Sequence, residues 1–171
     1  MSFTNPEIQI SDLPSFEDIS YNDLAPAYAR VNAIVVFVID TLLMLGLLAA
    51  ARLKFPDLPT VLQAVAICLA LVLVALSTVF SWYAARAKRY AVRKHDLAFE
   101  SGLFWKSQTI QPLRRVQHVE VARGPIDKRF GIAHVRLFSA GSGAASFTIP
   151  GLLLADAEQL REFVLSYKDS A

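Results

Sequence analysis

Cysteine, histidine and, over one long stretch, charge are scarce in this sequence of 171 residues. Its single cysteine, Cys68, excludes a disulfide within one chain, and we expect it to be a small buried core residue. The histidines (His95, His118 and His134) lack the spacing of a helical metal-binding pair, and the sequence has no nucleophile-elbow motif around a serine. We therefore expect no catalytic residue, no metal and no cofactor, and a protein that is not an enzyme.

Basic residues are missing from positions 1–29, which carry five acidic residues. A cleavable signal peptide starts with a basic region, so this composition argues against one. We interpret residues 1–29 as an acidic N-terminal segment and its end, residues 16–28, as a flexible or interfacial lead-in. Residues 86–171 have the opposite balance, with 14 Lys and Arg against 8 Asp and Glu.

Two long apolar runs predict a transmembrane hairpin at residues 30–86. The first run covers about residues 31–51 and contains one charged residue, Asp40, whereas the second covers about residues 62–85 and contains none. Each run is long enough to cross a hydrocarbon core of about 30 Å at 1.5 Å per residue. Helices that are apolar on every side are typical of membrane spans.

Basic residues near the ends of the runs predict the orientation of the hairpin. The loop between the runs has only Arg52 and Lys54. By the positive-inside rule, the C-terminal domain and both termini lie in the cytoplasm. A second interpretation of the larger cluster is a patch that binds anionic lipid headgroups. That cluster, which follows the second run, consists of Arg86, Lys88, Arg89, Arg93 and Lys94.

Asp40 lies near the middle of the first run, where an ionisable side chain suggests a function. In an antiparallel hairpin its depth matches that of Ser77 and Thr78, so a neutral Asp40 would form a hydrogen bond with one of these hydroxyls. The same counting places Gly46 beside Ala70, where small residues allow close helix contact. Two alternatives remain open for Asp40: contact with a span of another subunit, and proton transport.

After the second run, the pattern predicts an α+β domain at residues 87–168. Hydrophobic residues alternate with period two, with a bulge near Gln117 or His118, and this indicates an antiparallel curved sheet or barrel. An amphipathic helix follows, with Asp156 as its cap. Its apolar stripe consists of Ala157, Leu160, Phe163, Val164 and Tyr167. The six expected strands cover residues 89–95, 96–102, 103–110, 115–122, 132–138 and 145–149.

The stretch RGPIDKRFGIAHVRL, residues 123–137, predicts a short capped helical turn between two strands. Gly124 fits the N-cap, Pro125 the first helical position and Gly131 the position after the end. Ile126 and Phe130, four residues apart, would anchor the turn to the core. The alternative, a phosphate-binding loop, would need more glycines or a free helix start aimed at a pocket.

Two other segments have local interpretations. The sequence AGSGAAS, residues 140–146, fits a flexible hairpin tip better than a phosphate cradle. Phe104 and Trp105 would lie on opposite faces of one strand, so one of them would be exposed or would meet the membrane or a partner. Arg114 and Arg115 lack an accompanying surface of stacking aromatic residues, so we expect no nucleic acid as a partner.

The spaced pattern from Arg89 onward resembles a known family. Its Tyr90, its Gly102, its run from Pro112 to Val121 and its turn from Gly124 to Gly131 match the bacterial pleckstrin-homology-like (PH-like) domain, bPH2, of YdbS-like membrane proteins. Ala157 and the two preceding spans match as well, and the resemblance covers about residues 24–168. It implies a bacterial inner-membrane protein with a PH-like domain. Family members are often associated with a larger relative that carries several such domains.

These observations lead to three functional hypotheses. The first is a non-enzymatic, membrane-anchored PH-like interaction module in a membrane protein complex. Its partner, besides the lipid bilayer, would be another membrane protein, such as a larger multi-domain relative, or a second copy of the chain. The second is a module that senses anionic lipids through the basic cluster. The third is an accessory subunit of a transporter that uses Asp40. The hairpin turn at Lys94–Asp96 is too short to cradle a headgroup as lipid-binding PH domains do.

Overall fold

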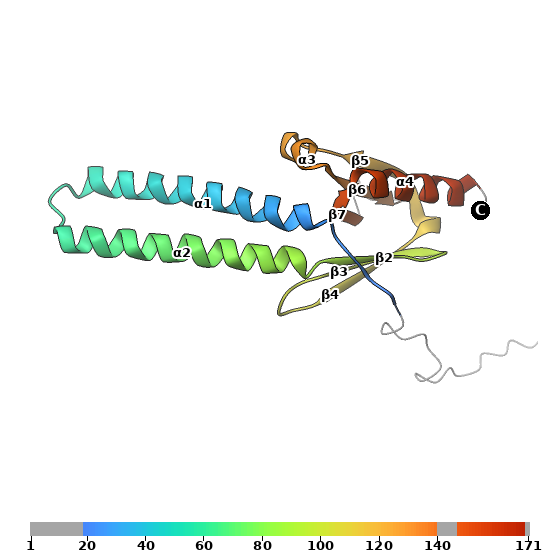
Figure 1. Ribbon diagram of the computed structural model, residues 1–171, viewed down its shortest axis with the longest axis horizontal. Coiled ribbons are helices and arrows are strands. Elements are labelled where there is room, and N and C mark those ends of the chain that lie inside the picture. The colour runs from blue at the N-terminus through green and yellow to red at the C-terminus, as the bar shows by residue number, and fades with distance from the viewer. Residues whose placement is uncertain (1–18, 140–146, 170–171) are drawn as a thin grey trace, which may run out of the picture.

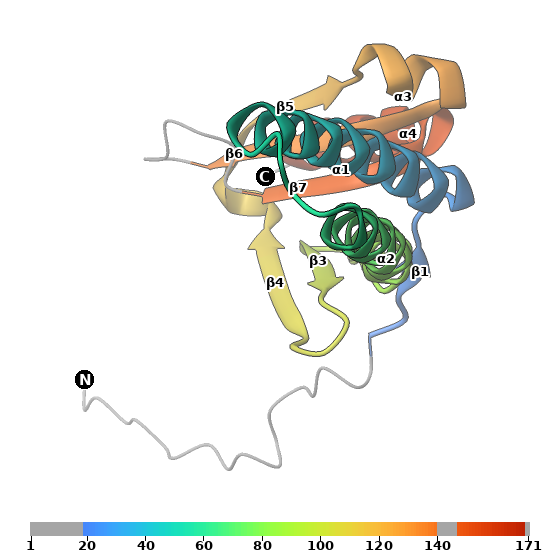
Figure 2. The same ribbon diagram turned by 90° about the vertical axis from the view of Figure 1, so that its left-hand side faces the viewer.

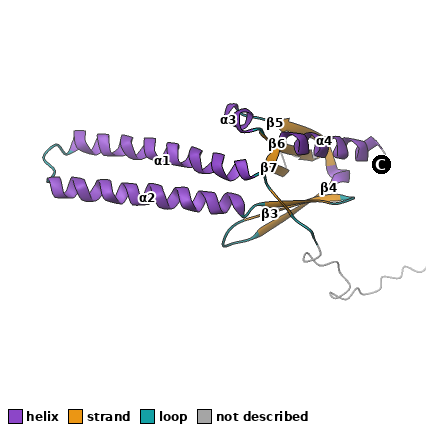
Figure 3. Ribbon diagram, viewed as in Figure 1, coloured by secondary structure: helices purple, strands orange, loops and turns teal. Residues whose placement is uncertain are grey.

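The computed structural model describes residues 19–139 and 147–169, so the expected hairpin tip at 140–146 and most of the acidic segment lie outside the described residues. A long helical hairpin extends from one side of a smaller domain (Figure 1). The domain contains all the described strands, and the hairpin consists of helix alone (Figure 3). This arrangement confirms the predicted fold class of two membrane helices followed by a PH-like α+β domain.

The hairpin consists of α1 (Pro26–Lys54) and α2 (Thr60–Arg86). Pro26 occupies the first turn of α1, where the missing amide hydrogen costs nothing. Each helix contains an 18-residue stretch with a mean hydropathy of 2.6, and most of the large apolar side chains of both helices are exposed. Because such surfaces are stable only in lipid, α1 and α2 are transmembrane helices.

The domain consists of two antiparallel sheets and a C-terminal helix. The strand order is β1-β2-β3-β4 in one sheet and β5-β6-β7 in the other. A 3-10 turn, η3, joins the sheets, and a short helix, α3, joins β5 to β6. The bounds are β1 Asn22–Asp23, β2 Arg89–Val92, β3 Asp96–Ser101, β4 Ser107–Pro112, η3 Leu113–Arg115, β5 Val116–Ala122, α3 Pro125–Phe130, β6 Ile132–Ser139, β7 Phe147–Leu153 and α4 Leu154–Asp169.

Three local predictions are confirmed. The register of β5 against β6 shifts between Val116 and His118, at the predicted bulge. α3 is bounded by Gly124 and by Gly131, which has a φ of 70° and closes the helix in the left-handed conformation. The predicted apolar stripe of α4 faces the core, where Ala157, for example, is fully buried.

Four details of the prediction are wrong. The strands form two sheets, and β1 comes from the segment interpreted as a lead-in. Phe104 and Trp105 lie in the turn between β3 and β4, because β4 begins only at Ser107. α4 begins at Leu154, so Asp156 lies in its first turn instead of capping it. Ile126 and Phe130 do not reach the core, because α3 has no buried residue.

The core of the domain continues into the hairpin. Leu97, Ile132 and Ile149 fill the space between the sheets and α4 and are fully buried. Tyr28 and Ala85, from the domain ends of α1 and α2, belong to the same hydrophobic cluster. Viewed along the hairpin, both helices run directly into the two sheets (Figure 2). The domain is therefore attached to its membrane helices by shared packing as well as by the chain.

Candidate functional site at the junction of hairpin and domain

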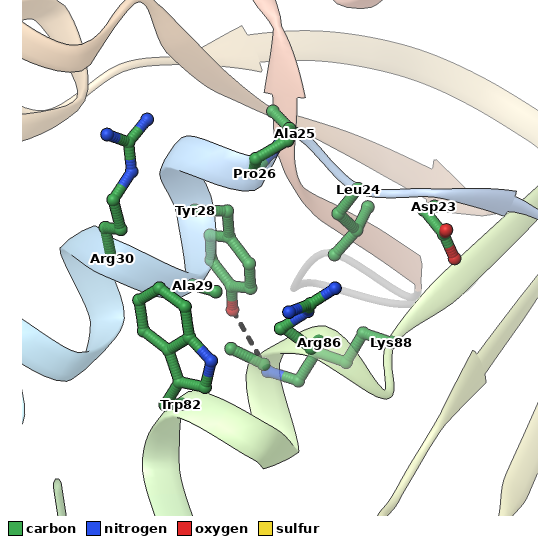
Figure 4. A pocket seen from close by; sticks show the side chains of 11 residues that line it. Asp23, Leu24, Ala25, Pro26, Tyr28, Ala29, Arg30, Trp82, Arg86 and Lys88 are labelled. Atoms are coloured by element: carbon green, nitrogen blue, oxygen red, sulfur yellow. Dashed lines mark hydrogen bonds between the residues drawn. The ribbon is translucent and has the colours of Figure 1, made fainter. Parts of the chain in front are cut away.

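A pocket of about 340 Å³ lies where the two membrane helices enter the domain. Its walls come from the end of β1, the first turns of α1 and the last turn of α2 with the residues that follow (Figure 4). Tyr28 and Trp82 contribute aromatic rings to these walls, and Arg30, Arg86 and Lys88 contribute basic groups. Among the described residues, Asp23 is the only acidic one in the lining.

The pocket depends on a close contact between α1 and β7. The amide of Ala25 donates a hydrogen bond to the carbonyl of Gly151 over 3.0 Å. Gly151 has a φ of 64°, and a Cβ at this position would lie 2.2 Å from Cγ of Tyr28. Only glycine both adopts this conformation easily and leaves room for the ring. The ring of Tyr28 therefore packs directly against the backbone of β7 at Gly151.

The basic groups of the pocket differ in their partners. Lys88 donates a hydrogen bond from Nζ to the hydroxyl of Tyr28 over 3.0 Å, as Figure 4 shows. Arg30 and Arg86 are exposed and form no hydrogen bond or ion pair with the described residues. Among the described residues, the lining carries three cationic side chains and one carboxylate, and this positive balance favours an anionic ligand.

The helices also place the pocket relative to the bilayer. The stretch of about 20 residues from Val61 to Phe80 spans about 30 Å, the thickness of a hydrocarbon core. Arg86 then lies about 9 Å beyond this boundary along α2. On α1, the same length counted back from Leu53 ends near Ile34, which leaves Arg30 about 6 Å outside. The headgroup layer is about 5–8 Å thick on each side. With this placement, Arg30 lies within the headgroup layer and Arg86 at or just beyond its outer edge.

The predicted basic cluster does not form one patch. Arg86 and Lys88 line the pocket. Arg89 instead forms an ion pair with Glu100, with 3.8 Å between a guanidinium nitrogen and Oε1. Arg93 binds Asp96 through two hydrogen bonds, of which the shorter is 2.6 Å, and this contact raises the pKa of the Arg93 guanidinium. Arg93 and Lys94 lie at the turn between β2 and β3, at the end of the domain away from the hairpin (Figure 1). A lipid patch of all five residues is therefore excluded.

Arg30 was missed by the sequence reasoning. Arg30 stands at the start of the first apolar run, but the orientation of the hairpin was predicted only from the basic residues between the runs and after the second run. What joins Arg30 to Arg86 is the antiparallel hairpin, which brings the start of α1 beside the end of α2. A count of basic residues at both ends of the hairpin that share one side of the membrane would have found the set.

Polar residues inside the hairpin contact one another. Ser77 donates a hydrogen bond to Asp40 over 2.5 Å, at the contact expected for Asp40. The hydroxyl of Thr78, the alternative partner, bonds to the carbonyl of Val74 in its own helix over 2.7 Å. A second contact, which the sequence reasoning missed, joins Asn32 Nδ2 to the hydroxyl of Ser81 over 2.6 Å.

Two expectations for small residues in the hairpin are wrong. Gly46 is exposed, and a Cβ built on it would meet nothing within 4 Å, so it makes no close contact with the buried Ala70. Cys68 is exposed on α2 instead of buried. Within residues 19–139 and 147–169, no three His, Cys, Asp or Glu side chains are grouped so that they could hold a metal ion.

Comparison with known proteins agrees with this architecture. A family model described as a bacterial PH domain (bPH_2) matches residues 33–168, from α1 to α4. The chain therefore belongs to the bacterial PH domain family, as the resemblance predicted. It is 36% identical over 76 residues to the UPF0699 transmembrane protein YdbS of Bacillus subtilis (strain 168). The aligned region covers 44% of this chain and 46% of YdbS, so it spans about half of this relative. No solved structure matches the chain.

Proposed function

We propose that the chain is a non-enzymatic, membrane-anchored interaction module that binds an anionic lipid headgroup in the junction pocket. The observation that carries the proposal is that Arg30, Arg86 and Lys88 all line one pocket at the end of the membrane hairpin that enters the domain. The excess of basic residues on the domain side supports a cytoplasmic location for the domain and both termini, and the family supports a bacterial inner membrane.

The chemistry of the pocket fits a phosphate group. A guanidinium can donate two parallel hydrogen bonds to phosphate oxygens, and neither Arg30 nor Arg86 is bonded to another of the described residues. Because apolar and aromatic side chains form part of the pocket wall, the attraction between opposite charges is stronger there than in bulk water. Tyr28 and Trp82 combine apolar rings with polar groups, which is the composition that prefers the boundary between lipid and water.

The test is native mass spectrometry of the full-length protein in mild detergent, with phosphatidylglycerol and phosphatidylcholine added in turn. We expect preferential retention of phosphatidylglycerol by the original protein and a loss of about tenfold in that preference in the Arg30→Gln/Arg86→Gln double variant. The Arg114→Gln/Arg115→Gln variant is the matched control, because it removes two exposed arginines from η3. Equal retention of both lipids by the original protein would refute the proposal.

A role as a subunit of a membrane assembly is the second candidate. The observation in its favour is an apolar groove of about 190 Å³ between α1 and α2, with Ala70 and Val74 in its lining. Side chains of a further transmembrane helix, from another membrane protein or a second copy of this chain, would fit such a groove. The transporter hypothesis gains no support from the contacts, because Asp40 bonds to Ser77 within the hairpin.

Purification in mild detergent tests the subunit role. Leu71→Ala removes an exposed side chain from the lining of the groove, whereas Leu69→Ala makes the same change at an exposed position of α2 outside this groove. We expect a stoichiometric membrane partner to be lost from the Leu71→Ala protein and kept by the Leu69→Ala protein. A pure monomer for the original protein would exclude the subunit role and leave lipid binding as the function.

A further inference from the structure

Two exposed apolar groups flank the hairpin where it leaves the bilayer. The turn prong is Leu103, Phe104 and Trp105, between β3 and β4, and the helix prong is Ile126 and Phe130 of α3. The β3–β4 turn and α3 lie at the end of the domain that borders the hairpin (Figure 1). Viewed along the hairpin, they lie on opposite sides of the two helices (Figure 2).

The turn prong has a fixed shape. Gly102 has a φ of 108°, and a Cβ at this position would lie 1.9 Å from the carbonyl oxygen of Trp105. Only glycine closes this turn without strain. The turn leaves the side chains of Phe104 and Trp105 74% and 88% exposed. Such exposure of two large aromatic side chains is costly in water unless another phase or partner covers them.

A ring contact gives the depth of the turn prong. Phe104 stacks on Phe80 of α2, with ring centroids 6.3 Å apart and an angle of 16° between the ring planes. Phe80 lies at the end of the stretch from Val61 that spans a hydrocarbon core. Phe104 therefore lies at the boundary between hydrocarbon and headgroups, with Trp105 in edge contact beside it. Tryptophan is enriched at this depth in membrane proteins.

The helix prong combines apolar and basic residues. Ile126 and Phe130, one turn apart, are 48% and 37% exposed, and α3 contacts α1. Lys128 and Arg129, also exposed, lie between them in the sequence. Apolar side chains beside lysine and arginine are the pattern of segments that lie in the headgroup layer of anionic membranes.

We propose that the two prongs insert into the surface of the bilayer that the hairpin spans and hold the domain against it at two points. The occupant of both apolar surfaces is lipid, because the Phe80–Phe104 stack makes the turn prong continuous with the lipid-facing surface of α2. The basic residues of the helix prong complement the negative charge of anionic headgroups. The domain therefore has a fixed tilt, with the junction pocket between the two contacts.

The fluorescence of Trp105 tests the turn prong. The chain has two tryptophans, so Trp82→Phe leaves Trp105 as the sole emitter in the full-length protein. In vesicles of phosphatidylcholine, we expect lipids brominated near the glycerol end of the acyl chain to quench Trp105, and aqueous iodide to have little effect. Efficient quenching by iodide with no response to brominated lipid would overturn the proposal and would indicate solvent or a soluble partner at this surface.

A second set of variants tests the helix prong. Ile126→Trp in a chain with Trp82→Phe and Trp105→Phe should also respond to brominated lipid, whereas Arg114→Trp in the same background should respond only to iodide. An iodide-accessible tryptophan at position 126 would overturn docking at two points. Phosphatidylcholine has no net charge, so these results do not depend on whether the pocket binds an anionic headgroup.

Discussion

The hydroxyl of Ser77 donates a hydrogen bond to the carboxyl of Asp40 across the hairpin, with 2.5 Å between Oγ and Oδ2. A polar side chain without a partner is costly in hydrocarbon, and this contact provides one inside the protein. Nearer the domain, about two turns along α1 and one turn along α2, Asn32 bonds to Ser81 in the same way. Two polar contacts at different depths hold α1 and α2 in one register.

Removal of the Ser77 hydroxyl should weaken the hairpin. Hydrogen bonds between membrane helices contribute about 0.6 kcal/mol on average and up to about 1.7 kcal/mol. We therefore expect Ser77→Ala to lower the free energy of unfolding by about 1 kcal/mol in a detergent titration. Thr78→Ala is the control and should change little, since Thr78 bonds within its own helix. Equal losses from both substitutions would contradict the inter-helix contact.

The Asn32–Ser81 contact should show a positive coupling energy. Asn32 donates to the hydroxyl of Ser81 over 2.6 Å, and Ser81 is buried. In a double-mutant cycle of Asn32→Ala and Ser81→Ala, we expect a coupling free energy of about 1 kcal/mol. The same unfolding titration of the four proteins measures it. Additive losses, with no coupling, would show that the two residues do not bond in the bilayer or detergent.

Gly151 and Gly131 should respond differently to the same substitution. Both have positive φ, but only at Gly151 would a Cβ collide, 2.2 Å from Tyr28, whereas at Gly131 it meets nothing within 4 Å. We expect Gly131→Ala to cost about 1–2 kcal/mol from the backbone alone. Gly151→Ala should cost about 3–5 kcal/mol, because the clash adds to the backbone cost. Thermal unfolding of both variants measures their stabilities. Equal losses of stability would contradict the packing of the Tyr28 ring against Gly151 of β7.

Two tyrosine hydroxyls offer a test of buried polar groups. The hydroxyl of Tyr21 is buried and has no hydrogen-bond partner among residues 19–139 and 147–169, whereas that of Tyr28 accepts a bond from Lys88. Tyr21→Phe should be neutral or slightly stabilising at pH 7, and Tyr28→Phe should cost about 1 kcal/mol. Chemical unfolding of both variants and of the original protein measures these differences in stability. A clear loss for Tyr21→Phe would reveal a partner for that hydroxyl.

The effect of Tyr21 should depend on pH. Burial of the phenol, and then the charge of Glu100, raise its pKa in the folded state. The neutral form is thus favoured on folding, so no stability is lost below the unfolded pKa of about 10. As the pH rises from about 10 through the higher folded pKa, the original protein should lose stability that Tyr21→Phe keeps. The gap between the two unfolding free energies, measured from pH 8 to 11, should therefore widen. A constant gap would contradict the raised pKa.

Local signals in the sequence predicted much of the fold. Gly124, Pro125 and Gly131 favour the start and the end of a short helix through local backbone preferences, and α3 lies where they predicted it. The stripe of α4 follows in the same way, because periodicity alone decides which face is buried. By contrast, β1 has only two residues, Asn22 and Asp23, and forms because Tyr90 and Arg89 pair with it from far along the chain. Short-range pattern contains no signal for such a strand.

The site was predictable only in part. Arg86 and Lys88 were found because they cluster in sequence, but Arg30 joins them only through the folded hairpin. The close contact expected for Gly46 failed because matching depth in a hairpin does not determine which side of a helix faces its neighbour. The exposure of Phe104 depends on the turn at Gly102, and the pattern of alternating residues had placed it in a strand.

The most direct test of the central proposal is the lipid that stays with the protein. The full-length chain would be purified from bacterial membranes in mild detergent, and its bound phospholipids extracted and quantified beside those of the whole membrane. We predict that phosphatidylglycerol is enriched over phosphatidylethanolamine in the original protein and falls to the membrane ratio in Arg30→Gln/Arg86→Gln. Bound lipid of the same composition as the membrane in the original protein would contradict a headgroup site at the junction.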